Sequence, residues 1–143
     1  MKKKLQNVII PKLFSATIIL AVLLLLQSCG LNNTQKKLEE VATEVSKRLP
    51  MDLGSGLKWT KAEALPNKVF KYSYVWENLE VAAMDTAAFK KEQEPTILET
   101  IKSEPSLKYF RDNDVVMEYD YNDKNGKPAY TITIAPEMYK SKK

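Results

Sequence analysis

The sequence contains no histidine and only one cysteine, Cys29, among its 143 residues. Without histidine, the Ser-His-Asp and Cys-His arrangements of nucleophilic enzymes are excluded, and metal sites lose their commonest nitrogen ligand. A disulfide within the chain is impossible with one cysteine. The chemistry that remains belongs to carboxylates, lysines, tyrosines and hydroxyls. Because histidine is the usual acid–base group, this inventory predicts a protein that is not an enzyme and holds no metal or cofactor.

An excess of either charge is also absent once the first 28 residues are set aside. The formal net charge of +4 comes entirely from Lys2, Lys3, Lys4 and Lys12, since residues 1–28 contain no acidic residue. Removing these four lysines from the 22 basic residues leaves 18, which equals the 18 acidic residues. A neutral domain lacks the electrostatic attraction to phosphates on which nucleic-acid binding depends, so we exclude a nucleic-acid partner.

The longest apolar run lies near the amino terminus and ends directly before the cysteine. Three lysines precede this run, and the segment Leu26-Gln27-Ser28-Cys29 closes it. A basic start followed by an apolar segment and a small residue is typical of a secretory signal peptide. Residues 8–26 are also long enough to span a bilayer, so an uncleaved membrane helix is the alternative. Pro11 within the run, together with a cysteine directly behind a small residue, favours cleavage.

The segment Leu26-Gln27-Ser28-Cys29 resembles the lipobox of bacterial lipoprotein precursors. Leu26 and Ser28 match the usual pattern, whereas Gln27 departs from it. The resemblance implies signal cleavage between Ser28 and Cys29, and a membrane partner that is bound through acyl chains on Cys29.

The resemblance to a lipobox divides the chain into three expected segments. We expect a signal peptide at 1–28, an acylated cysteine with a short tether at 29–33, and a single domain at 34–143. An aspartate directly after the cysteine would resemble an inner-membrane retention signal, and Gly30 does not match it. We therefore expect a lipid anchor in the bacterial cell envelope that faces the periplasm, with the outer membrane favoured over the inner.

The first half of the domain is predicted to form one helix and two strands. Apolar residues recur with helical spacing over 34–49, and Pro50 ends the helix because it restricts the residue before it. A strand is predicted at 57–65 and another at 68–76, where aromatic residues alternate with other residues. The aromatic positions of the second strand are Phe70, Tyr72, Tyr74 and Trp76.

The second half is predicted to form another helix and a hairpin. Asp85 is placed to cap a helix that buries Phe89 and Ile97, and Pro95 predicts either a kink or a new helix that starts near Glu94. Alternating strands at 115–121 and 128–135 flank Asn125-Gly126. Both turn residues tolerate a positive φ, which is typical of a hairpin between such strands.

These elements predict an α+β domain with the order helix, strand, strand, helix, strand, strand. We expect a four-stranded antiparallel sheet with the two helices on one face. The order of elements resembles that of small envelope lipoproteins and of proteinaceous inhibitors of the β-lactamase-inhibitor type. No residue is carried across by this resemblance, which concerns element order alone.

The candidate binding residues are aromatic side chains that alternate along the predicted strands. They are Trp59, Tyr72, Tyr74, Trp76, Tyr119 and Tyr121. Rings on one face of a sheet either supply the core beneath the helices or form a stacking surface for a glycan or peptide. Because two helices need a surface to pack on, we favour the core.

Three functions are compatible with this sequence. The leading hypothesis is a non-catalytic interaction or accessory module that binds an envelope protein, and the second is a lipoprotein that binds a small glycan or peptide ligand through its aromatic residues. The third is a hydrolase that uses Glu118 and Asp120, which share a strand face at roughly 7 Å. Pairing of these carboxylates with Lys71 on a neighbouring strand is the simpler explanation.

Overall fold

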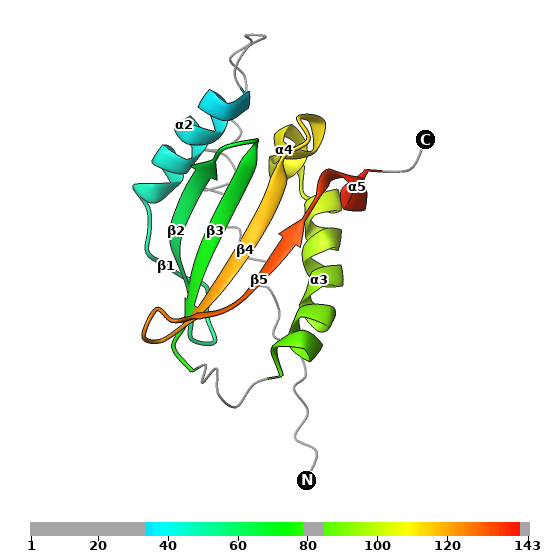
Figure 1. The fold of residues 1–143 in the computed structure, drawn as a ribbon. Helices are drawn as coiled ribbons and strands as arrows, with labels where there is room; N and C mark the ends of the chain where they lie inside the picture. Colours follow the sequence, from blue (N-terminus) through cyan, green and yellow to red (C-terminus); the bar gives the residue numbers. More distant parts are fainter. Residues whose placement is uncertain (1–33, 79–84, 141–143) are drawn as a thin grey trace.

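The computed structural model describes residues 34–78 and 85–140. The predicted signal peptide, cleavage site and acylated cysteine therefore lie outside the described residues. The elements are α2 (Thr34–Ser46), β1 (Met51–Asp52), β2 (Leu57–Leu65), β3 (Val69–Trp76), α3 (Thr86–Ser103), the 3-10 helix η2 (Pro105–Leu107), α4 (Lys108–Asp112), β4 (Val116–Asp123), β5 (Pro128–Ile134) and α5 (Pro136–Tyr139) (Figure 1). Among these residues, none of the helices combines the length and apolar character needed to cross a bilayer.

The strands form one five-stranded sheet in the order β1-β2-β3-β4-β5. The α+β class is confirmed, but the four-stranded antiparallel sheet is wrong in two respects. The short strand β1 pairs with β2 and adds a fifth strand, and the two central strands β3 and β4 run parallel.

The connection between β3 and β4 explains why these two strands are parallel. The 18 residues of α3 span about 27 Å, and the 8 residues of β3 span about 26 Å. The helix therefore returns the chain to the end of the sheet at which β3 began. From that end β4 must run in the same direction as β3, as in other helical crossovers.

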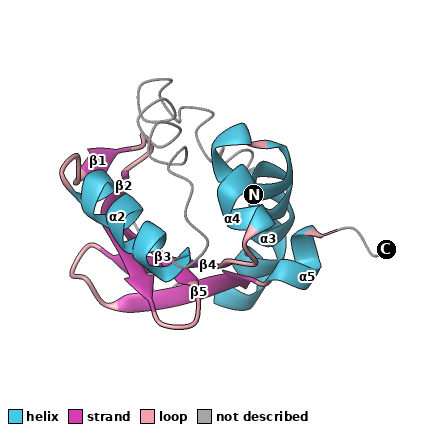
Figure 2. Cartoon of the chain, turned by 90° about the horizontal axis from the view of Figure 1, so that it is seen from above, coloured by secondary structure: helices cyan, strands magenta, loops and turns pink. Residues whose placement is uncertain are grey.

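Both long helices lie on one face of the sheet, above its outer strands. Helix α2 packs on β2 and α3 packs on β5, so each helix lines one side of the sheet while β3 and β4 form the middle (Figure 2). The sides of α2 and α3 that face the sheet carry the predicted buried residues, among them Leu38, Val41, Phe89 and Ile97. The placement of the two helices on one face is as expected.

Helix α3 begins as the sequence indicates but does not end where one alternative placed it. The Asp85 carboxylate accepts hydrogen bonds from the backbone N–H groups of Ala87 and Ala88, at 3.1 and 3.0 Å. The helix then continues through Pro95, so the start of a new helix near Glu94 is wrong. Pro95 is exposed, and its ring therefore displaces no core side chain.

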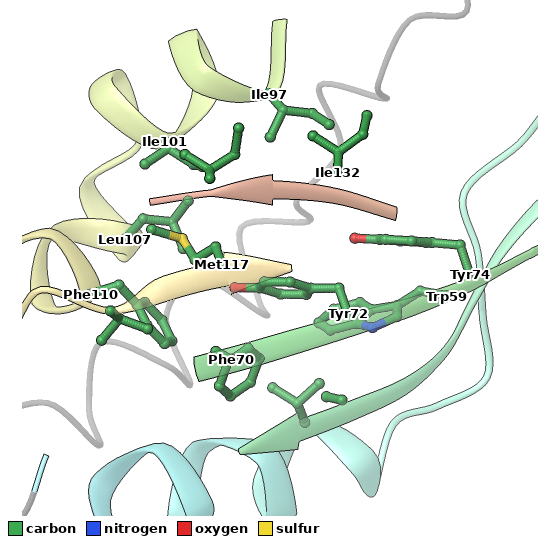
Figure 3. Close-up of a cluster of buried hydrophobic side chains, with 14 of the residues drawn as sticks. Trp59, Phe70, Tyr72, Tyr74, Ile97, Ile101, Leu107, Phe110, Met117 and Ile132 are labelled. Atoms are coloured by element: carbon green, nitrogen blue, oxygen red, sulfur yellow. The ribbon is translucent and has the colours of Figure 1, made fainter. Parts of the chain in front are cut away.

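The core beneath α3 and α4 is apolar and tightly buried. Phe70 on β3 contacts Phe110 on α4, with ring centroids 5.1 Å apart. Ile97 and Ile101 on α3 face Ile132 on β5 (Figure 3). Each of these side chains is at most 2% exposed, and burial of one such side chain contributes about 1.5–3 kcal/mol to folding.

The hairpin predicted around Asn125-Gly126 is confirmed, because β4 and β5 pair antiparallel. Of the two residues Asn125 and Gly126, Gly126 alone has a positive φ, of 76°. The buried carboxylate of Asp123 accepts hydrogen bonds from the N–H groups of Asn125 and Lys127, at 2.8 and 2.9 Å. This side-chain cap stabilises a longer loop, as aspartate does in Asx turns.

Candidate functional site

The face of the sheet that carries the helices presents a continuous set of aromatic rings, which we call the aromatic face. Its members are Trp59 on β2, Tyr72, Tyr74 and Trp76 on β3, Tyr119 and Tyr121 on β4, and Tyr130 on β5. Tyr72 pairs in register with Tyr119, and Tyr121 with both Tyr74 and Tyr130. Residues paired across strands project from the same face, so the pairing brings all of the predicted aromatic residues together.

Most neighbouring rings of the aromatic face are stacked on one another. The centroids of Tyr72 and Tyr119 are 4.9 Å apart, those of Tyr74 and Tyr121 5.1 Å, and those of Tyr121 and Tyr130 4.7 Å. Trp59 extends the set onto β2, where its ring lies 5.5 Å from that of Tyr72. Offset stacking at such distances stabilises aromatic pairs beyond the area that they bury.

The rings of the aromatic face differ in how far they are exposed. Trp59, Tyr72 and Tyr121 are buried, at 4–6% exposure, whereas Trp76 and Tyr119 are only partly buried. The indole N–H of Trp59 donates to the Lys61 carbonyl at 2.8 Å. The aromatic face therefore contributes to the core over most of its area and is accessible at two of its rings.

Burial keeps the tyrosines of the aromatic face in their neutral form. It raises the pKa of Tyr72, Tyr74, Tyr119, Tyr121 and Tyr130 well above the usual value for a phenol. A neutral phenol can stack and can donate or accept a hydrogen bond, but it does not act as a base near neutral pH. These buried phenols therefore supply no base near neutral pH.

Two polar residues on the side of α3 and β5 were missed by the sequence analysis. Tyr130 could have been found, because it has the same strand parity as Ile132 and Ile134. Gln93 lies on the buried side of α3, between Phe89 and Ile97. A lone amide in that position gives no signal in a sequence, because an exposed glutamine is the common case.

The opposite face of the sheet is polar, and one of its two candidate carboxylates is bound by neighbouring side chains. The Asp120 carboxylate lies 3.2 Å from the Lys71 ammonium and accepts a hydrogen bond from the Thr131 hydroxyl at 2.6 Å. Glu118 stands directly opposite Lys71 in the register. Over residues 34–78 and 85–140, no group of three metal-ligating side chains is gathered.

No family model and no curated protein sequence matches this chain. Solved structures with a similar fold do exist. PA3611 of Pseudomonas aeruginosa, named as a secreted protein, has a TM-score of 0.64 at 13% identity, over 79% of this chain and 100% of that one.

Two further solved structures are pilotins of type II secretion systems. The pilotin EpsS of Vibrio vulnificus has a TM-score of 0.59 at 12% identity, over 76% of this chain and 93% of that one. The pilotin AspS of Vibrio cholerae has a TM-score of 0.51 at 15% identity, over 73% and 94%. At such identities these likenesses establish a shared α+β fold.

Proposed function

We propose that this chain is a non-catalytic, lipid-anchored accessory protein of a secretion system in the bacterial cell envelope. The observation that carries the proposal is the aromatic face, which lies on the side of the sheet that α2 and α3 pack on, in a fold shared with two pilotins of type II secretion systems. The protein would hold one protein component of such a system close to the membrane.

The anchor in this proposal is the cysteine of the lipobox-like segment. Acyl chains on Cys29 would fix the domain to a membrane through a tether of only a few residues, 30–33. Because those four residues reach at most ~14 Å, the domain would act next to the headgroups. We propose the outer membrane and a periplasm-facing domain, in agreement with the residue that follows the cysteine.

The aromatic face is the proposed surface for the protein partner. Tyr119 and Trp76 are its partly exposed rings, and tyrosine and tryptophan are enriched where proteins bind one another. A glycan would need flat, open rings to stack on. The faces of Tyr72 and Tyr121 are already covered by neighbouring rings, which favours a protein partner over a sugar.

A non-catalytic role agrees with the state of the polar groups. Asp120, one of the two carboxylates considered for hydrolysis, is already bound by Lys71 and Thr131. The tyrosines of the aromatic face are neutral, because their pKa values are raised by burial. With Asp120 bound and the tyrosines neutral, Glu118 has no second free carboxylate beside it. Hydrolysis of a glycosidic bond by this chemistry requires two.

Photocrosslinking in intact cells tests this proposal. A photoreactive phenylalanine replaces Tyr119 in one strain and Thr133, an exposed residue of the opposite face, in a matched control strain. We expect a crosslink from position 119 to a single envelope protein that belongs to a secretion system, and no such crosslink from position 133. Crosslinks to lipid and abundant porins alone, or equal yields at both positions, would contradict the proposal. A Cys29→Ser strain tests the anchor separately, because its product should leave the membrane fraction.

A further inference from the structure

The described domain begins at one end of the molecule, which we call the anchor end. It consists of residues 34–37, 66–68, 102–114 and 137–140, which are the first turn of α2, the β2–β3 turn, the end of α3 with η2 and α4, and α5 (Figure 1). Under the proposed function, residues 30–33 join the acylated Cys29 to Thr34 at the start of α2. Because those four residues reach at most ~14 Å, the anchor end is the part of the domain that is held nearest to the headgroups.

Hydrogen bonds join the segments of the anchor end to one another. The Thr34 hydroxyl donates to the side-chain oxygen of Asn113 at 3.2 Å. Lys68, in the β2–β3 turn, donates its backbone N–H to the side chain of Gln35 and its ammonium group to the backbone carbonyl of Asn113, each at 3.3 Å. The start of α2, the β2–β3 turn and the end of α4 therefore form one connected surface beside the point at which the tether begins.

Positive charge exceeds negative charge at the anchor end, which contains seven basic and four acidic residues. Four of the basic residues form no ion pair with a carboxylate of the described residues, namely Lys36, Lys68, Lys102 and Arg111. The three lysines among them are exposed. The guanidinium of Arg111 donates instead to the backbone carbonyls of Ile101 and Glu104, at 2.5 and 2.8 Å.

The other lysines of the anchor end are each bound to a carboxylate. The three ion pairs are Lys37 with Glu40, Lys108 with Asp112 and Lys140 with Asp114. Glu104 and Glu137 are the acidic residues of this end that form no ion pair within the described part of the chain. After pairing, cations still outnumber carboxylates on this surface.

The opposite end of the domain has no such excess of positive charge. Its residues, 51–56, 77–78, 85–92 and 122–127, include four basic and five acidic ones. The eight residues of β3 between the two ends span about 26 Å. Since salt screens charges beyond about 8 Å at physiological ionic strength, a surface that lies against the anchor end interacts with the charges of that end alone.

We propose that the anchor end binds the anionic phospholipid headgroups of the membrane and so holds the domain upright, with the β4–β5 loop farthest from the bilayer. This inference rests on the proposed function, because the acyl chains supply the affinity and the lysines supply the orientation. Each lysine close to an anionic membrane favours contact about fivefold. The exposed lysines are too few to hold a free domain on a membrane, but they are enough to select one orientation of an anchored domain. The upright orientation leaves the aromatic face directed along the membrane, where an envelope protein can reach it.

Quenching of a fluorophore by lipids that carry a nitroxide on the headgroup tests this orientation. The acylated protein is purified from membranes with one added cysteine, Ser103→Cys at the anchor end or Asn125→Cys in the β4–β5 loop, both exposed positions. It is placed in vesicles of phosphatidylcholine alone, or of phosphatidylcholine and phosphatidylglycerol in equal parts. On the anionic vesicles we expect quenching at position 103 to exceed that at position 125 at least about fivefold. This ratio should fall severalfold on phosphatidylcholine alone and at high salt, which screens the lysines.

Two charge-reversal variants locate the effect on the surface of the domain. Lys36→Glu/Lys68→Glu reverses two unpaired charges of the anchor end, and the matched control Lys91→Glu/Lys124→Glu reverses two exposed lysines near the opposite end. The first variant should reduce the quenching ratio on anionic vesicles to the value seen on phosphatidylcholine, whereas the control should keep the wild-type ratio. Thermal unfolding followed by circular dichroism verifies that both variants are folded, and the high-salt comparison gives the same answer on the unaltered surface.

Three results would overturn the inference. They are equal quenching at positions 103 and 125 on anionic vesicles, a ratio that is the same with and without phosphatidylglycerol, and an equal loss of the ratio in the control variant. Sedimentation of the protein with vesicles of phosphatidylcholine alone reports on the acyl anchor by itself. A failure of the proposed orientation is therefore distinguished from a failure of the anchor, and neither affects the crosslink at position 119.

Discussion

Tyr72 on β3 stacks on Tyr119 on β4 across the parallel pair at the centre of the sheet, with ring centroids 4.9 Å apart and ring planes inclined by 13°. The two residues stand directly opposite each other in the register. This stack joins the first hairpin of the chain to the second, because β3 and β4 are the inner strands of the two hairpins. The parallel pairing that the sequence analysis did not predict is thus reinforced by side chains that it did single out.

The stack predicts a measurable coupling between these two residues. Tyr72→Leu and Tyr119→Leu should each lower the free energy of unfolding by about 1–3 kcal/mol. The double variant should lose less than the sum of the two, by about 0.5–1.5 kcal/mol, since the ring contact can be lost only once. Urea unfolding of the four proteins of the cycle measures this. Combining Tyr72→Leu with Glu92→Ala, an exposed change on α3, should give additive losses.

Alkaline pH should unfold the protein through its buried tyrosines. Burial raises the folded-state pKa of Tyr72, Tyr74 and Tyr121 above the unfolded value of about 10. The stability that depends on their neutral form is therefore fully present below pH 10 and is lost as the pH rises above it. Above pH 10, the free energy of unfolding should fall by about 1.4 kcal/mol per pH unit for each such tyrosine.

Two spectroscopic signals measured together test this pH dependence. Tyrosinate absorbance from the buried residues should appear only together with the loss of the folded circular dichroism signal. Tyr139 should behave in the same way, because burial is the main cause that raises its pKa to about 12. Full ionisation near pH 10 with the fold intact would contradict the burial of these rings.

The local elements could be read from the sequence, whereas their assembly could not. Alternation of aromatic residues placed β3, and Asp85 placed the start of α3, because both signals depend on neighbours in the chain. The direction of β4 depends on the length of the connection relative to the strand, which no local pattern contains. The Tyr130 hydroxyl is buried without a hydrogen-bond partner among the described residues, and this state depends on β4 and α3 together, so it was also outside the reach of a sequence pattern.

Replacing Pro95 by alanine should stabilise the protein. Pro95 lies in the interior of α3 and is exposed, so it lacks the N–H that would bond to the preceding turn and offers no core contact in exchange. Alanine restores that hydrogen bond, although it also raises the entropy of the unfolded chain. We expect a net gain of about 1–2 kcal/mol in the free energy of unfolding. This is the helix-propensity difference between proline and alanine, reduced by the greater entropy of the unfolded alanine variant. Denaturant unfolding measures it, and a loss of stability would show that the helix needs the proline for its path along β5.

The loop that joins β4 to β5 should depend more on Asp123 than on the Asn-Gly pair that drew attention to it. Asp123→Ala removes the acceptor of two backbone hydrogen bonds and leaves the N–H groups of Asn125 and Lys127 without their partner. We expect a loss of about 1–3 kcal/mol in the free energy of unfolding.

A companion substitution in the same loop separates the side-chain cap from the backbone conformation. Asn125→Ala should cost less than 0.5 kcal/mol, on the order expected of an exposed surface change, because Asn125 is exposed and has no positive φ. Urea unfolding of the two variants side by side decides the matter. Equal losses would mean that the turn is held by the asparagine, as a tight two-residue hairpin would be, and that the aspartate cap is incidental.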